Sequence, residues 1–235
     1  MNIFKIALIL IIGNTFLSCR KENSEGIDQS EIYADYRIIY KEDLNKTFAR
    51  ATFKHQLNTG ENLKLGKDAS ILVNGVDMVW NSTFKRYEYD FLDLDTISTS
   101  NQFLNSFSFT DNDGAQFKNK LNFNKVAQYN KQTASNDSLY KDSIQFIPWD
   151  NADPLVSGEY VNLIMIQNKI IIELSNDTIG ATGVFINSDS FDPFQLGDIE
   201  VHFEKWVDFP LHTNNAGGNG KSQTISKTKT VKLLN

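Results

Sequence analysis

The sequence predicts an all-β protein made of β-sandwiches, and two observations lead to this fold class. Apolar residues recur with period two through most of the chain after Tyr33, and turn-forming residues separate the resulting segments at roughly 8–12-residue spacing. No stretch of a dozen residues carries an amphipathic helical stripe with caps at its ends. Many short strands with regular turns are typical of a sandwich or a barrel.

The first half of the chain contains the clearest strand signals. In residues 47–56, Ala49, Ala51 and Phe53 fall on one face while charged and polar residues fall on the other. Asn74-Gly75 separates two short apolar runs, which is a strong signal for a hairpin. Further strands are expected at 86–92, 103–110 and 115–123.

The second half repeats this pattern after a polar segment, 124–141, that has no period and is interpreted as a linker. Strands are expected at 143–147, 159–166, 169–174, 180–186, 199–206 and 230–234. Residues 32–123 and 142–235 are then each about 95 residues long, the size of an Ig-like β-sandwich. The alternative is one larger sandwich or barrel.

The N-terminus has the three-part plan of a signal peptide over residues 1–18. Lys5 supplies the positive charge, 6–12 is an uninterrupted aliphatic run, and Gly13 ends it. This run is too short to cross the roughly 30 Å hydrocarbon core of a membrane. The sequence therefore predicts export.

The single Cys of the chain, Cys19, stands where such a peptide would be cleaved. Leu17-Ser18-Cys19 resembles the lipobox of bacterial lipoproteins, although Phe16 replaces the usual Leu. The resemblance implies acylation (palmitate) at Cys19 and a membrane anchor. Arg20 follows, which by the same resemblance favours the outer membrane. Residues 19–31 are polar and charged and are expected to form a flexible tether after the lipid.

Composition excludes several function classes. A formal net charge of −6 and a pI near 5.1 argue against nucleic-acid binding. One Cys and three dispersed His leave no pattern for a disulfide framework or a zinc site, so no metal or cofactor is expected. No serine nucleophile motif or other catalytic constellation is present, and the protein is not expected to be an enzyme.

Two motifs resemble ligand loops but have simpler interpretations. Asp111-Asn112-Asp113-Gly114 begins like a calcium loop, yet the residue at loop position 12 is Asn122, so a turn is expected. The segment 215–222, NAGGNGKS, nearly fits a phosphate loop. It is followed by a strand-like segment instead of a helix, so a hairpin loop is expected.

Exposed aromatic side chains are the best candidates for ligand contact. Trp149 and Trp206 lie at predicted strand ends, and Phe209 follows in a predicted loop. These rings either stack on the apolar face of a sugar or close the core, since Trp is large and rarely fully buried. The loops of 207–222 are the expected recognition surface.

Nearly the whole mature chain resembles a group of functionally uncharacterised cell-envelope lipoproteins of Gram-negative bacteria that carry two tandem Ig-like sandwiches. The matching segments are ASILVNGVDMVW, FSFTDNDGAQFKN, WDNADPLVSGEYVNL and AGGNGKSQTISKTKTVKLL. The resemblance implies a fold and a location but no catalytic residues. We expect a non-catalytic binding or scaffolding module with a glycan or envelope-protein partner. A structural spacer and a hydrolase with a diffuse carboxylate site are the alternatives.

Overall fold

The computed structural model describes residues 23–91, 104–122, 128–129, 138–150, 152–212 and 217–235. Regular structure in this part of the chain is β-strand apart from two 3-10 turns, η1 (Gln29–Glu31) and η2 (Ser188–Phe191). No helix in the described ranges is long and apolar enough to cross a membrane. The first nine strands are β1 (Ile32–Lys41), β2 (Lys46–His55), β3 (Asn62–Leu63), β4 (Ser70–Val73), β5 (Val76–Asp77), β6 (Val79–Asn81), β7 (Arg86–Phe91), β8 (Leu104–Thr110) and β9 (Gln116–Asn122).

The remaining strands are β10 (Gln128–Tyr129), β11 (Ser138–Tyr140), β12 (Gln145–Asp150), β13 (Glu159–Gln167), β14 (Ile170–Asn176), β15 (Gly183–Ile186), β16 (Gly197–Pro210), β17 (Gly218–Ile225) and β18 (Lys229–Leu234). Within the described residues they form an 11-stranded sheet, a 4-stranded sheet β5-β4-β8-β9 and a 3-stranded sheet β10-β12-β15. The largest sheet, called the shared sheet below, runs β11-β18-β16-β17-β1-β2-β7-β6, with β13 beside β16, β14 beside β13 and β3 beside β2.

The first core lies between one half of the shared sheet and the 4-stranded sheet. Tyr36 of β1 stacks on Phe107 of β8, with ring centroids 4.8 Å apart, and Phe53 of β2 contacts Phe109 at 4.6 Å. All four rings are almost fully buried. Burying large aromatic side chains of this kind is the main stabilising contribution to such a core.

The second core lies between the other half of the shared sheet and the 3-stranded sheet. Phe203 of β16 meets the edge of Trp149 of β12, with centroids 6.1 Å apart and planes at 80°. Leu163, Val201 and Val231 from the shared sheet are buried in the same cluster. The predicted all-β fold class with two β-sandwiches is therefore confirmed.

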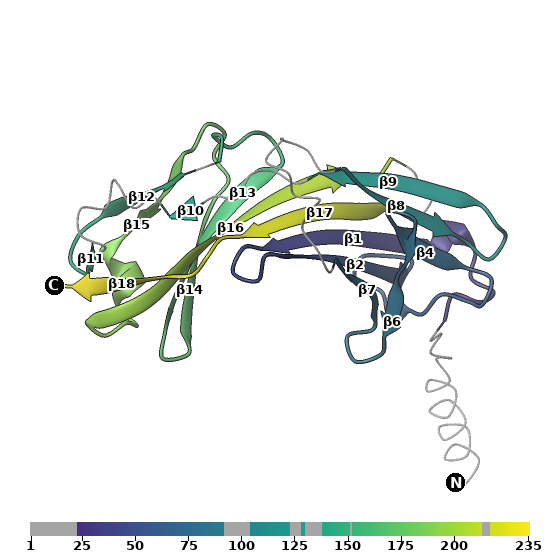
Figure 1. The fold of residues 1–235 in the computed structure, drawn as a ribbon, viewed down its shortest axis with the longest axis horizontal. Helices are drawn as coiled ribbons and strands as arrows, with labels where there is room; N and C mark the ends of the chain where they lie inside the picture. The colour runs from purple at the N-terminus through teal and green to yellow at the C-terminus, as the bar shows by residue number, and fades with distance from the viewer. Residues whose placement is uncertain (1–22, 92–103, 123–127, 130–137, 151, 213–216) are drawn as a thin grey trace, which may run out of the picture.

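One long strand, β16, belongs to both sandwiches (Figure 1). Its odd-numbered residues are buried along most of its length: Phe203 lies in the second core, and Phe209 packs against the first. Because side chains of a strand alternate between faces, both small sheets cover the same face of the shared sheet. We call the opposite face the open face.

The middle of the molecule, between the cores, contains a buried ion pair. The Nζ of Lys205 lies 3.0 Å from a carboxylate oxygen of Glu159, and their side chains are only 3% and 5% exposed. The same carboxylate accepts a hydrogen bond from the backbone N–H of Val156. Charges taken out of water in this way depend on each other for solvation.

The division of the chain into two sandwiches differs from the predicted one after residue 207 and in the predicted linker. Strand β17 pairs in parallel with β1, from Ala34 opposite Gly218 to Lys41 opposite Ile225, and so completes the sheet of the first sandwich. Residues 207–222 were expected to form loops, but 207–210, with Phe209, belong to β16 and 218–222 belong to β17. Gly220 has a packing role in this strand, because a Cβ at this position would lie 3.3 Å from Leu121, Leu211 and Phe209.

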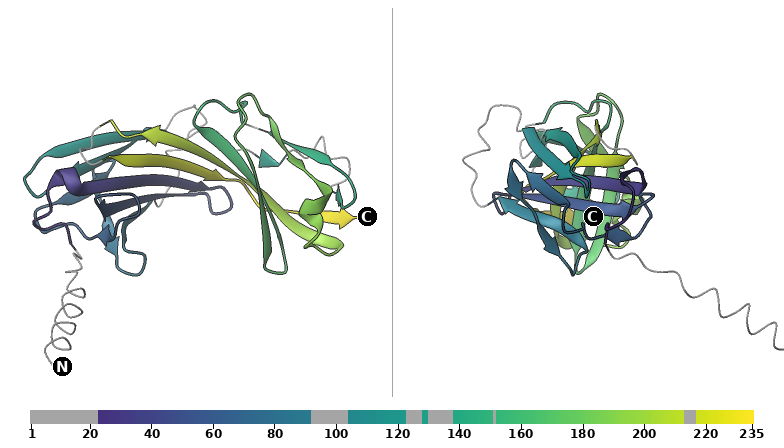
Figure 2. Two further views of the ribbon diagram at one scale, coloured as in Figure 1. Left: turned by 180° about the vertical axis from the view of Figure 1, so that it is seen from behind. Right: turned by 90° about the vertical axis from the view of Figure 1, so that its right-hand side faces the viewer.

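Strand β11, in the predicted linker, pairs with β18. Figure 2 (left) shows from behind that β16 runs from the second sandwich into the first.

The segment from Asn23 to Glu31, expected to be part of the flexible tether, packs on the first sandwich. Asn23 forms a bridge with Lys64, Ser24 is fully buried, and Ile27 joins the first core. The side chain of Asp28 caps η1 by accepting a hydrogen bond from the N–H of Ser30. Burial of Ile27 and these hydrogen bonds order a segment whose composition alone indicated a tether. The predicted signal peptide and Cys19 lie outside the described residues.

Replacing Lys205 with Met should lower the free energy of unfolding by about 3–5 kcal/mol, because Glu159 would remain buried without its cation. Urea denaturation measures this change. Lys221→Met is the matched control, since its pair with Asp208 is partly exposed and should contribute less than about 1 kcal/mol. The double variant Glu159→Met/Lys205→Met should recover most of the loss. Equal losses for Lys205→Met and Lys221→Met would contradict this interpretation.

Candidate functional site

A stack of three side chains lies on the open face where the two sandwiches join. Tyr160 of β13 and Trp206 of β16 are register partners, with ring centroids 5.9 Å apart and planes at 5°. The guanidinium carbon of Arg37, on β1, lies 5.4 Å from the centroid of Trp206. Since β13 and β1 lie on opposite sides of β16, Tyr160 and Arg37 approach the indole from opposite sides.

The carboxylate of Glu204 holds this stack in place from the same strand. It accepts a hydrogen bond from Nε1 of Trp206 at 3.3 Å and another from Nε2 of Gln223 at 2.9 Å. Nε2 of His202 lies 3.7 Å from its other oxygen. Burial acts to raise the pKa of Glu204, but contacts with His202 and the two hydrogen bonds outweigh burial and lower this pKa. Glu204 therefore favours its charged form.

The next rows of the open face combine cations with acidic side chains. Lys221 of β17 lies 3.1 Å from Asp208 of β16. Burial raises the pKa of Asp35 on β1, although the positive charges of Arg37, Lys54 and Lys221 oppose this shift. Burial also raises the pKa of Tyr160. The region is thus dense in charge but only partly exposed.

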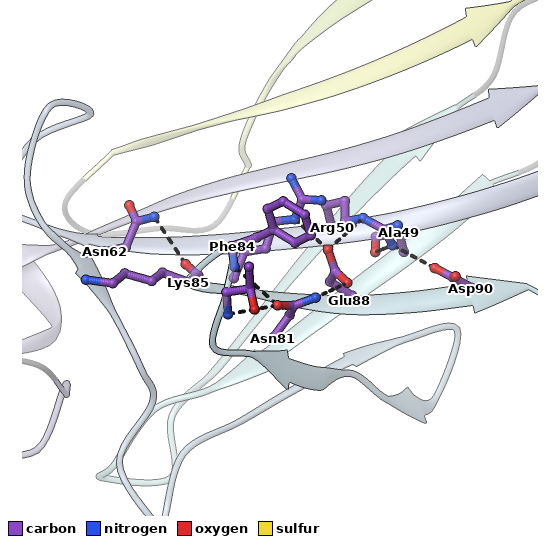
Figure 3. A network of polar contacts seen from close by, with 10 residues as sticks. Ala49, Arg50, Asn62, Asn81, Phe84, Lys85, Glu88 and Asp90 are labelled. Carbon is purple, nitrogen blue, oxygen red and sulfur yellow. Dashed lines mark hydrogen bonds and ion pairs between the residues drawn. The ribbon is translucent and has the colours of Figure 1, made fainter.

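Further along the face, in the first sandwich, every prominent charge of one network is paired. Figure 3 shows Arg50 of β2 between Glu88 and Asp90 of β7, at 3.2 and 2.8 Å respectively. Arg86 and Asn81 complete the contacts of Glu88. Burial acts to raise the pKa of Glu88, and these partners lower it overall. This network has the geometry of a structural contact because each charge is already neutralised.

The three aromatic residues predicted to contact a ligand do not come together. Trp149 is 5% exposed and belongs to the second core, so a surface ligand cannot reach its ring face. Phe209 packs against the first core, on the face opposite Trp206. Only Trp206 lies on the open face, where it is partly exposed. Even there, its ring faces are occupied by Tyr160 and Arg37.

Arg37 and Tyr160 are the site residues that sequence reasoning missed. The alternation of β1 places Tyr33, Asp35 and Arg37 on one polar face, and this signal was readable in the sequence. The strand that lies beside β1 could not be predicted from the sequence, because it depends on the parallel pairing of β1 with β17.

The calcium-like segment forms the turn that was expected. Oδ1 of Asp111 accepts hydrogen bonds from the N–H groups of Asp113 and Ala115, at 3.0 and 2.8 Å. Its carboxylate thus supports the β8–β9 turn. In the described part of the chain, no cluster of three or more His, Cys, Asp or Glu residues is arranged to hold a metal ion.

Comparison with known proteins does not identify the family of this chain. No protein-family model matches the chain, and no curated protein matches it in sequence. Among the solved structures it is similar to the titin Ig tandem domains A164-A165, at 8% identity over 86% of this chain and 95% of that chain. The TM-score is 0.22, so this likeness carries no argument, and the two sandwiches are assigned from their own sheets and cores.

Replacing Glu204 with Gln should make stability less sensitive to acid. Because the pKa of Glu204 is lowered in the folded protein, its stabilising contribution is present above the usual value of 4.5 and is lost as the pH falls further. Between about pH 7 and about pH 3, Glu204→Gln should therefore lose less free energy of unfolding than the wild type. Urea denaturation at a series of pH values measures the difference. Glu200→Gln, at an exposed position of the same strand face, is the control. A wild-type slope in Glu204→Gln would show that the shift is absent.

Proposed function

We propose that this protein is a non-catalytic binding module of the bacterial outer membrane, anchored by a lipid on Cys19, that recognises its partner through the open face. The observation that carries this proposal is the stack of Tyr160, Trp206 and Arg37 at the junction of the two sandwiches. Side chains that are fixed by stacking and hydrogen bonds lose little entropy on binding, which favours recognition.

The site is better suited to binding than to hydrolysis. A glycosidase needs a pair of facing carboxyl groups, one of which stays protonated near neutral pH. On the open face, Glu204 accepts hydrogen bonds from Trp206 and Gln223 and has a lowered pKa, and Asp208 is paired with Lys221. The carboxyl group with a raised pKa, Asp35, is surrounded by cations. We therefore favour a binding module over an enzyme.

The position of the predicted anchor supports presentation of the protein away from a membrane. Cys19 precedes by four residues Asn23, where packing on the first sandwich begins. The first sandwich, with η1, and the last strand, β18, lie at opposite ends of the molecule (Figure 1). A lipid on Cys19 would therefore hold the first sandwich near the membrane and direct the second outward.

Replacing Cys19 with Ala should abolish lipid labelling of the protein in a Gram-negative host. Without the thiol no acyl chain can be attached, and several acyl chains are what makes such anchoring stable. Fractionation of cells labelled with palmitate analogues measures both modification and location. Ser18→Ala is the control and should remain labelled and membrane-bound. Equal lipid labelling of the Cys19→Ala variant and the wild type would contradict a lipid anchor on Cys19.

Replacing both Tyr160 and Trp206 with Ala should abolish partner binding, because it removes the stack that positions Arg37. Binding is measured on an array of neutral and acidic oligosaccharides and by photo-crosslinking from the open face in intact cells. Tyr140→Ala, an exposed Tyr of β11, is the matched control. Retained binding by the double variant would exclude the open face. A wild-type protein that binds no oligosaccharide and forms no crosslink would favour the structural spacer.

A further inference from the structure

Three cationic side chains lie in one row across neighbouring strands of the open face. The register of β1 with β2 places Arg37 opposite Arg50, and the register of β1 with β17 places Arg37 beside Lys221. Like charges on directly paired positions of a sheet are destabilising. This arrangement is unexpected in a protein whose formal net charge is −6.

Two of these cations have carboxylate partners, and the third does not. Arg50 is paired with Glu88 and Asp90. Lys221 is paired with Asp208. Arg37 forms no ion pair or hydrogen bond with any residue that the structure describes, and its contact is the stack on Trp206. The charge of Arg37 acts on Asp35, two residues away on β1, but no described carboxylate forms an ion pair with Arg37.

The stack on Trp206 fixes the orientation of Arg37 without using its N–H groups. A guanidinium presents five N–H donors in a planar fork that fits the two oxygens of a carboxylate. Its guanidinium carbon lies 5.4 Å from the centroid of the Trp206 ring, and none of its N–H groups donates to a residue that the structure describes, so they remain available to a ligand. Lys221 is the register partner of Arg37 on β17 and carries a positive charge that is shared with Asp208. The chemical group that fits this position is an oxyanion, and a carboxylate is one that the fork can hold through two N–H groups.

The surroundings of Arg37 indicate which kind of molecule carries that carboxylate. Protein interfaces usually have an apolar, aromatic centre. The described residues of β1, β2, β13, β16 and β17 include no large, well-exposed apolar side chain. The exposed apolar residues of the shared sheet lie on its outer strands, such as Ile171 of β14 and Val79 of β6. Hydroxyl and amide groups, including Tyr33, Thr52 and Gln223, line the central rows instead.

We propose that the open face binds an acidic saccharide whose carboxylate is held by Arg37, with Lys221 beside it. This inference rests on the proposed function, because it names the ligand class of the same face. It assigns recognition to the edge of a guanidinium instead of to the face of an aromatic ring. Trp206 then acts as a positioning residue for Arg37.

The test is calorimetric titration of the full chain with trigalacturonate, and with the neutral trisaccharide of galactose as reference. Arg37→Gln should weaken trigalacturonate binding about tenfold or more, because a charge-assisted bidentate contact is lost. Arg37→Lys should recover only part of the affinity, since Lys lacks the fork. Wild-type affinity should fall as salt is raised. Arg86→Gln, on the same face but paired with Glu88, is the control and should bind like the wild type.

Several results would overturn the proposal. Unchanged affinity in Arg37→Gln would exclude Arg37, and equal affinity for the neutral trisaccharide would exclude an acidic ligand. Equal binding of a poly-glutamate peptide would exclude a saccharide as the specific class. In these cases the binding-module proposal stands if the Tyr160/Trp206 double variant still loses its partner. If trigalacturonate does not bind the wild type, this inference fails. The proposed function fails with it only if the oligosaccharide array and the crosslinking experiment are also negative. The melting temperature of each variant shows whether it is folded.

Discussion

The backbone ladder of β16 is the interaction on which the rest of the structure depends. This strand pairs with β13 and β18 in the second sandwich and with β17, itself paired with β1, in the first. Tandem domains joined only by a linker have an orientation that depends on the side chains of a small interface. Here the two cores share a hydrogen-bonded sheet. Their relative position is therefore set by strand geometry, with the buried pair of Lys205 and Glu159 at the crossing.

The shared sheet also explains why a polar surface of this size can be ordered. Alternation along β16 directs odd-numbered side chains to the cores and leaves Glu204, Trp206 and Asp208 on the other face. Because β1 and β17 continue that face, residues from both ends of the chain meet around Trp206. Stacking and hydrogen bonds then hold these side chains in place without a hydrophobic cover. The geometry that joins the sandwiches is thus the geometry that assembles the candidate site.

Local patterns in the sequence predicted the strands well and their partners poorly. Alternation around Ala49 and Phe53 and the turn at Asn74-Gly75 both correspond to observed elements, and Asn74 and Gly75 have the positive φ that this turn needs. The strand around Gly220 was missed because its glycines are typical of a loop, whereas here they admit Leu121 and Leu211. Trp149 and Trp206 have similar local contexts in the sequence. The face of the sheet on which each side chain lies makes Trp149 a core residue and Trp206 a surface residue. Pairing between residues far apart in sequence is not encoded in period or composition.

The parallel pairing of β1 with β17 also sets an order of events in folding. Ala34 and Gly218 are partners, so the sheet of the first sandwich contains a strand from near each end of the chain. Long-range pairing of this kind requires closure of a large loop and is slow. A chain that emerges from its N-terminus could not complete the first sandwich until residues 218–225 had emerged as well. Until then β1 would lack its partner β17, and the backbone groups on that edge of β1 would stay unpaired.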